Sequence, residues 1–353
     1  MTMLKRYQTP ALLIALLLLI AVPADLTGLG IPWTGFRRYG LYIMSLWLVT
    51  AIAAMGVNLI MGYAGQETLA QAAFLGIGAY TMALLTTKLG VPYFLAFAAA
   101  GVLCFAIGVL LGFPALRVQK HYLAFVTLAF SVFVWLVIRN EQWLTGGVFG
   151  IQDVPRPVIL GFRTRPPLYF YWFVLFMAVV LAGVMWWILR SPWGRAFTAL
   201  RENPIRAESL GIDVRSYKLL AFAIGSAYGG FAGALYAPLV EFIDPAPFAL
   251  GPSLFYLLMI LVGGMGYFFG PFVGAAVGVL LPEWLRFAEG LAPIIFAVIV
   301  MVMVAFAPTG IIGLIERLLT PKRRPHADVT GPTLGSALAK PAEDNAPSSK
   351  VSS

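Results

Sequence analysis

Long apolar runs constrain the fold of this chain more strongly than any other feature. They cover residues 10–24, 40–61, 68–86, 93–112, 121–139, 168–189, 217–239, 250–264, 270–286 and 291–307. A helix needs about 20 apolar residues to cross a bilayer, and most of these runs approach that length; the first, eighth and last are short. The sequence therefore predicts an all-α polytopic membrane protein, a helical bundle of about ten (8–10) transmembrane helices.

The charge content supports this class and argues against a nucleic-acid partner. Only 11% of the residues are charged, whereas soluble globular chains have about 25%. The formal net charge is +9, but the basic residues lie in loops and termini, where the positive-inside bias puts them. A nucleic-acid surface needs them on one folded face. We expect a lipid bilayer and no nucleic acid as partners.

Residue types that carry catalysis or bind metals are scarce. The single cysteine, Cys104, excludes an internal disulfide and a cysteine metal cluster, and its helical spacing with Ala100, Gly108 and Gly112 is typical of a packing position. The two histidines lie far apart in the sequence. We predict no catalytic residue and no metal ligand. The sequence GxxxxGK followed by Ser or Thr is missing, so this chain is not expected to bind and hydrolyse ATP by that machinery.

Loop charges predict the orientation of the spans. If ten spans are counted, four groups of basic residues fall on one side of the membrane: Lys5-Arg6, those of 117–120, those of the stretch 190–218 and those of 317–324. This side is then cytoplasmic, and both termini lie on it. Arg37-Arg38 and a group of three arginines between 156 and 165 fall on the other side, against the rule.

The two ends of the chain are expected to differ from the rest. The N-terminus has basic residues, an apolar run and a small-residue site typical of a signal peptide, but an uncleaved first span fits the topology better. From about Pro321 the composition favours a disordered cytoplasmic tail. We predict an N-terminal span and external loop (1–39), a transmembrane domain (40–320) that contains the cytoplasmic loop 190–218, and a tail (321–353).

The hydrophilic stretch 190–218 contains signals for two short helices. Ser191-Pro192 and Asn203-Pro204 each place a capping residue before a proline, a pattern typical of a helix start. Gly211 stands where a C-terminal cap needs positive φ. Two capped helices exceed what a connecting loop requires, so we predict that a partner docks here.

A second stretch, 58–80, combines glycines and polar residues inside an apolar region. Gly62 and Gly65 interrupt the run, and Gln66, Glu67 and Gln71 follow. A charge inside the bilayer costs about 2.5–3.5 kcal/mol on insertion scales, and broken helices at membrane depth often line substrate paths. The alternative is a tight cytoplasmic turn with Glu67 in water. The candidate path residues here are Tyr63, Gln66, Glu67 and Gln71.

Two series of small residues predict close helix packing. In lipid, close backbone approach through small residues drives helix association. The series recur every four residues: Ala221, Gly225, Gly229, Gly233 and Ala237, and Gly266, Gly270, Gly274 and Gly278.

Six stretches together resemble the permease of branched-chain amino acid ABC importers, specifically its M-type subunit. They appear in the family's order within residues 40–315: NLIMGYAGQETLAQAAFLGIGAY (58–80), YLAFVTLAF (122–130), TGGVFGI (145–151), WGRAFTALRENPIRAESLGI (193–212), KLLAFAIGSAYGGFAGALYAPL (218–239) and GGMGYFFGPFVGAAVGVLLPE (263–283). The third, by itself typical of a turn, adds Thr145, Gly146 and Gly147 to the candidate path.

The resemblance implies a function for the stretch 190–218. In ABC importers a short cytoplasmic helix of the permease docks on the ATPase; here it would run from Asn203 to Leu210. The implied coupling residues are Glu202, Asn203, Pro204, Arg206, Ala207, Glu208, Leu210 and Gly211. The resemblance also implies ATP-binding subunits, a second homologous permease, a periplasmic solute-binding protein and a bacterial inner membrane. This chain would bind no cofactor, since ATP would sit on the partners.

Departures from the family pattern keep alternatives open. Gln71 replaces a usual histidine, and Val148-Phe149 follows the glycine pair where a small polar residue is common. Urea, amides, or aromatic or carboxylic acids are therefore alternative solutes. An ion-coupled secondary transporter would need acids in mid-span, and the chain offers few, Glu67 and Glu283. A membrane scaffold has no evident use for the broken stretch 58–80.

Overall fold

A computed structural model describes residues 36–115, 120–159, 162–163, 167–284, 294–295, 297–298, 300–302 and 309–319. Contacts divide the chain into two units, Met1–Glu316 and Arg317–Ser353, and the first contains nearly all of the described residues. The predicted span 10–24, the signal-peptide alternative and the tail 321–353 lie outside the described residues.

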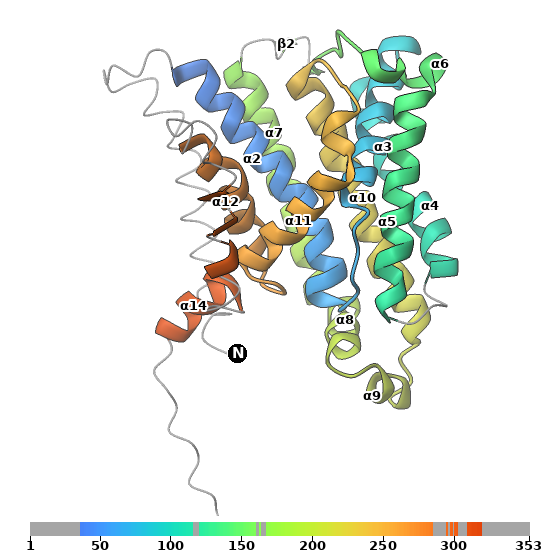
Figure 1. Cartoon of the computed structure of the whole chain (residues 1–353), viewed down its shortest axis with the longest axis vertical. Coiled ribbons are helices and arrows are strands. Elements are labelled where there is room, and N and C mark those ends of the chain that lie inside the picture. The colour runs from blue at the N-terminus through green and yellow to red at the C-terminus, as the bar shows by residue number, and fades with distance from the viewer. Residues whose placement is uncertain are drawn as a thin grey trace, which may run out of the picture. The chain divides into compact units, whose positions relative to one another are not determined.

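Five helices in the described part are long and apolar enough to cross a membrane. They are α2 (Phe36–Val57), which continues as the π-helix η1 (Asn58–Tyr63), α4 (Tyr93–Ala115), α5 (Lys120–Asn140), α7 (Pro167–Arg190) and α10 (Val214–Val240) (Figure 1). This arrangement confirms the helical polytopic class. The count of ten spans stays a prediction, because 10–24 and much of 291–307 are not described.

Three further apolar helices are shorter. α3 (Gln71–Ala83) continues as the π-helix η2 (Leu84–Lys88), and α11 (Leu250–Gly263) and α12 (Gly270–Trp284) follow near the end of the first unit. The 14 residues of α11 rise about 21 Å at 1.5 Å per residue, which is less than the ~30 Å of a bilayer core. The eighth apolar run therefore forms a short helix, and that this helix crosses the membrane stays a prediction.

The remaining elements connect these helices. α6 (Gln142–Thr145), η3 (Gly147–Phe149) and the antiparallel pair β1 (Val158–Ile159) and β2 (Phe162–Arg163) lie between α5 and α7. α8 (Pro192–Glu202) and α9 (Pro204–Ser209) join α7 to α10, η4 (Ala246–Phe248) precedes α11, and α14 spans Gly310–Leu319. α2 begins at Phe36, so Arg37 and Arg38 belong to a helix rather than to the predicted external loop.

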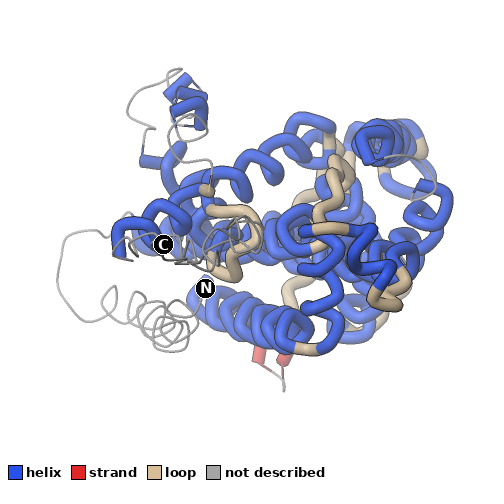
Figure 2. The backbone as a smooth tube through the Cα atoms, turned by 90° about the horizontal axis from the view of Figure 1, so that it is seen from below, coloured by secondary structure: helices blue, strands red, loops and turns tan. Residues whose placement is uncertain are grey.

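Helix α10 packs against α2, α3 and α4 through its small residues. Figure 2 shows that helices make up nearly all of the described chain, with the two short strands at its edge. Gly225 leaves room for Ile60, Gly229 faces Phe74, and a Cβ at Gly233 would collide with the backbone of α3. The first small-residue series is therefore a helix-packing ridge, as predicted. Cys104 is fully buried and lies against Gly230, which confirms it as a small packing residue.

The second small-residue series is only partly a ridge. Gly270, Gly274 and Gly278 lie on α12 and pack against the end of α11. Gly266 instead lies in the turn between these helices, with a φ of +81°. A four-residue spacing does not separate a helix from a turn that leads into it, so the prediction that Gly266 belongs to the ridge was wrong.

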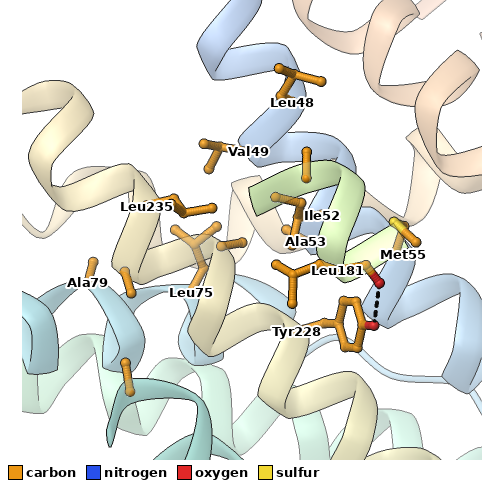
Figure 3. Packing of buried hydrophobic residues seen from close by; sticks show 14 of the residues in the cluster. Leu48, Val49, Ile52, Ala53, Met55, Leu75, Ala79, Leu181, Tyr228 and Leu235 are labelled. Atoms are coloured by element: carbon orange, nitrogen blue, oxygen red, sulfur yellow. Dashed lines mark hydrogen bonds between the residues drawn. The ribbon is translucent and has the colours of Figure 1, made fainter. Parts of the chain in front are cut away.

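The core gathers where α2, α3, α7 and α10 meet. Leu48, Val49 and Ile52 of α2 pack with Leu75 of α3 and Leu235 of α10 in one buried cluster (Figure 3). A hydrogen bond connects α10 to α7 within this cluster: Tyr228 Oη donates to the Leu181 carbonyl oxygen at 2.7 Å. The bond satisfies the hydroxyl, which would otherwise be costly to bury.

Candidate functional site

The two short helices after α7 begin where the sequence predicts. The Ser191 side chain accepts a hydrogen bond from the Trp193 amide at 3.2 Å, and Pro192 is the first residue of α8. Asn203 Oδ1 accepts from the amides of Ile205 and Arg206, both at 3.1 Å, at the start of α9. These bonds satisfy amides that a helix start leaves free, so both predicted N-caps are confirmed.

The end of α9 is equally well defined. Gly211 has a φ of +82°; its amide donates to the Glu208 carbonyl at 2.9 Å, and the Ile212 amide to the Ala207 carbonyl at 3.1 Å. This pair of bonds is the Schellman motif, which favours glycine at the left-handed position. The predicted C-cap is confirmed, and the six residues of α9 are held at both ends.

Helix α9 presents an exposed surface that combines apolar and charged side chains. Ala207 is buried, whereas the apolar Ile205 and Leu210 are 78% and 79% exposed. The side chains of Glu202, Arg206 and Glu208 are also exposed, and Asn203 and Pro204 are half-buried. Figure 1 shows α8 and α9 together at one end of the long helices. Apolar side chains displayed by a rigid, charged segment are suited to contact with another protein.

A third cap continues this end of the molecule into α10. The Asp213 side chain accepts hydrogen bonds from the amides of Arg215 and Ser216 and from Ser216 Oγ. The Ser216 hydroxyl bond, followed by the backbone bonds, holds the pKa of the Asp213 carboxyl below its usual range. The carboxylate therefore stays ionised, and the cap intact, at a pH where an ordinary aspartate begins to take up a proton.

Replacing Asn203 with alanine should loosen α9 without affecting the long helices. The change removes the acceptor of two amide hydrogen bonds, and loss of such a cap costs about 1 kcal/mol, or roughly a fivefold rise in local opening. Limited proteolysis should therefore cut within residues 203–212 about five times faster than in the unchanged chain. Asn203→Asp, which keeps the acceptor, should be cut at the original rate; equal rates for all three chains would contradict the role of the cap.

The second predicted site is a break between η1 and α3. Residues 65–70 form neither helix nor strand, and other elements satisfy part of their backbone. The Leu69 amide donates to Thr127 Oγ1 of α5 at 3.1 Å, and the Ala72 amide to Ser253 Oγ of α11 at 3.1 Å. Non-helical backbone at membrane depth requires such partners.

The predicted path residues in this region have different environments. Gln66 and Gln71 are only 3% and 2% exposed; their side-chain amides donate to the carbonyls of Lys218 at 3.0 Å and Ala53 at 2.7 Å. Among the described residues, neither amide oxygen finds a hydrogen-bond partner. Tyr63 is half-buried, whereas Glu67 is exposed, the environment that the alternative of a turn with Glu67 in water requires.

The predicted path residues after α5 lie elsewhere. Thr145 Oγ1 donates to the Ile138 carbonyl at 2.7 Å, and Gly146 and Gly147 have φ values of +78° and +61°, which only glycine adopts at little cost. These residues shape a turn. Figure 1 shows α6 at the end of the long helices opposite α8 and α9. The structure therefore does not bring this group together with Tyr63, Gln66, Glu67 and Gln71.

Two side chains outside the predicted set connect the site. Asn58 of η1 accepts from the Gly266 amide and donates to the Tyr267 carbonyl, both at 2.9 Å. Arg201 Nη1 of α8 donates to the Gly62 carbonyl. Asn58 could have been found from the sequence, because it is a lone asparagine within an apolar run. No local signal distinguishes Arg201 from the other arginines of 190–218.

Nothing in the described part of the chain gathers ligands for a metal ion. No group of three or more His, Cys, Asp or Glu side chains lies together there. The site thus consists of hydrogen-bonded connections between distant segments and a short, capped helix with exposed apolar and charged side chains.

Comparison with known proteins decides the class. A family described as the branched-chain amino acid transport system, permease component, matches residues 39–308, most of the chain. The chain belongs to this family. Membership makes it a transport permease with several membrane spans, and implies ATPase and solute-binding partners in general terms.

Relatives of this permease family differ in the solutes that their names state. The high-affinity branched-chain amino acid permease protein LivM of Escherichia coli K12 is 33% identical over 293 residues, 76% of this chain and 69% of the relative. A probable LivM of Methanocaldococcus jannaschii is 26% identical over 79% of this chain and 95% of its own length. The autoinducer 2 import permease LsrC of Escherichia coli O157:H7 is 24% identical over 77% of this chain and 75% of its own length. No solved structure matches the chain.

Proposed function

We propose that this chain is the permease subunit of an ABC importer for branched-chain amino acids, with α9 as the helix that receives movement from an ATPase. The observation that carries the proposal is α9 itself, a helix capped at both ends that exposes Ile205 and Leu210 among charged side chains. Family membership and the identity to LivM supply the solute class.

The complex that we propose contains four kinds of component. This chain pairs with a second homologous permease, and the translocation path runs between them. Two ATPase subunits carry the ATP, one of them bound to this chain at α9, so this chain binds no cofactor and is not an enzyme. A periplasmic protein delivers the solute. The α8–α9 end is then cytoplasmic in a bacterial inner membrane, as the basic residues of 190–218 favour.

The charge of α9 supports a specific complementarity. Arg206 and Glu208 are both exposed, and the Arg206 carbonyl accepts from Ser209 Oγ at 2.9 Å within the last turn. Charged side chains on a fixed helix align a partner and reject wrong ones. The candidate path residues Gln66 and Gln71, with their buried amide oxygens, are proposed as the polar part of the route on this side of the permease pair.

The proposal is tested by purifying the tagged chain gently from its native membrane and reconstituting what accompanies it. We expect two ATPase subunits and a second permease, and ATP-dependent uptake of radiolabelled leucine. The charge reversal Glu208→Lys should release the ATPase subunits, whereas Glu67→Gln should retain them. Recovery of the chain alone, with uptake insensitive to ATP depletion, would instead favour an ion-coupled secondary transporter.

Two observations favour a different solute class. The relative LsrC is named for autoinducer 2 import, and Val148 and Phe149 replace the small polar residues common in the branched-chain family. Binding of leucine, urea and an aromatic acid to the co-purified periplasmic protein separates the classes. Tight binding of leucine supports the proposed solute, and binding of another compound in its place would contradict it.

A further inference from the structure

Arg201 connects α8 to the broken end of α2. It lies in the last turn of α8, and its guanidinium Nη1 donates to the Gly62 carbonyl of η1. Its Cα and Cγ lie against Gly65, where an added Cβ would come within 3.3 Å of both. The side chain of Arg201 is exposed overall, but its bond to the Gly62 carbonyl is charge-assisted, a type about twice as strong as a neutral hydrogen bond.

The same guanidinium reaches the turn between α11 and α12. A Cβ at Gly266 would collide with Arg201 Nη1, so this turn and the arginine are in contact. The turn is in addition fixed to η1, since Asn58 holds both the Gly266 amide and the Tyr267 carbonyl at 2.9 Å. Tyr267 Oη continues the connection to Glu316 of α14 at 2.8 Å. Three segments distant in sequence, the end of α8, the end of η1 and the 264–267 turn, thus meet at Arg201, and Tyr267 links this turn to α14.

Arg201 lies close to the start of α9 in the sequence, so this contact also connects α9 to η1 and to the 264–267 turn. Asn203 is both the C-cap of α8 and the N-cap of α9, so only Glu202 separates Arg201 from the shared cap. Among the described residues, the guanidinium has no carboxylate within ion-pair distance. Its hydrogen bond goes to the Gly62 backbone carbonyl instead, and this bond ties the arginine to the fold of η1 rather than to a neighbouring charge.

We propose that Arg201 is a positioning residue that carries displacement of α9 into the membrane. Through Gly62 it moves the end of α2, and through the 264–267 turn it moves α11 and α12 in the same step. Rigid elements joined by hydrogen-bond networks are what physical coupling between distant sites requires. The inference rests on the proposed function, because it needs an ATPase that moves α9.

The test compares transport with ATP hydrolysis in the complete complex in proteoliposomes, with radiolabelled leucine as the solute. For Arg201→Ala we expect assembly and ATP hydrolysis within twofold of the unchanged complex, and at least a tenfold fall in leucine transported per ATP. Arg201→Lys keeps a charged donor and should recover the ratio to within threefold. Arg195→Ala, on the same helix and with an exposed side chain, is the control and should leave the ratio unchanged.

A purely structural arginine would give a different result. It would lower uptake and hydrolysis in parallel, with the ratio preserved, and that outcome would overturn the inference, as would an equal fall for Arg195→Ala. If the Arg201→Ala complex failed to assemble, the test would use Arg201→Gln, whose side chain is a neutral donor. The same fall in leucine transported per ATP is expected for this variant. Lack of ATP-dependent uptake by the unchanged complex would mean that the proposed function itself is wrong, a result that the variants do not produce.

Discussion

Replacing Gly211 with proline should reduce leucine uptake more than tenfold while the permease still inserts and assembles with its partner permease. The native φ of Gly211 is +82°, and proline fixes φ near −65°. Proline also removes the amide that donates to the Glu208 carbonyl at 2.9 Å. The last turn of α9 must therefore open, and Leu210, which is 79% exposed and belongs to the proposed docking surface, changes position.

The matched control for this change is Gly211→Asn. Asparagine tolerates the left-handed region better than other side chains and keeps the amide donor, and nothing lies within 4 Å of a Cβ at this position. We expect it to retain most of the uptake. The measurement is ATP-dependent leucine uptake and ATP hydrolysis in proteoliposomes at equal permease content. Equal uptake by Gly211→Pro and Gly211→Asn would remove α9 from the coupling mechanism.

Replacing Gly233 with alanine should destabilise the bundle by about 3 kcal/mol or more, the upper end of the usual cost of overpacking. A Cβ at this position would collide with the Leu75 carbonyl oxygen and lie 2.7 Å from the Ala79 amide nitrogen. Both are backbone atoms of α3, which cannot rotate away as a side-chain end would. The two helices must separate, and the contacts on either side of Gly233 are lost with them.

Gly183→Ala is the control, because an added Cβ there meets nothing within 4 Å. It lies within α7, and exchange of a helix glycine for alanine is neutral or favourable by up to about 1 kcal/mol. Chemical unfolding in mild detergent, followed by tryptophan fluorescence, measures both variants. Similar unfolding midpoints for Gly233→Ala and Gly183→Ala would contradict the prediction, because they would show that α3 and α10 can accommodate a Cβ at Gly233.

Several features of the fold were predictable because their causes are local. A cap is a bond between a side chain and amides two or three residues away, so Ser191, Asn203 and Gly211 could be identified from the sequence. Long apolar stretches have one favourable state in a bilayer, which made α2, α4, α5, α7 and α10 predictable. The roles of the coupling and path residues stay predictions.

Other features depend on neighbours that no local pattern reveals. The third apolar run was predicted from residue 68, but α3 begins only at Gln71, since Thr127 and Ser253 satisfy backbone amides on either side of that start. The four-residue spacing of Gly266 is compatible with both a ridge and a turn. In the structure Gly266 lies in the turn, where its backbone amide donates a hydrogen bond to Asn58, 208 residues away in sequence.

Membrane class, span positions and the caps of 190–218 follow from the residues alone, because hydropathy and capping act over one span or one helical turn. Only the tertiary structure separates Thr145–Gly147 from Gln66 and Gln71, and only it places Arg201 against Gly62 and Gly266. The physical reason is the same in each case. A hydrogen bond between distant segments depends on where whole helices pack, and that packing is decided by the close approach of backbones at glycines such as Gly233.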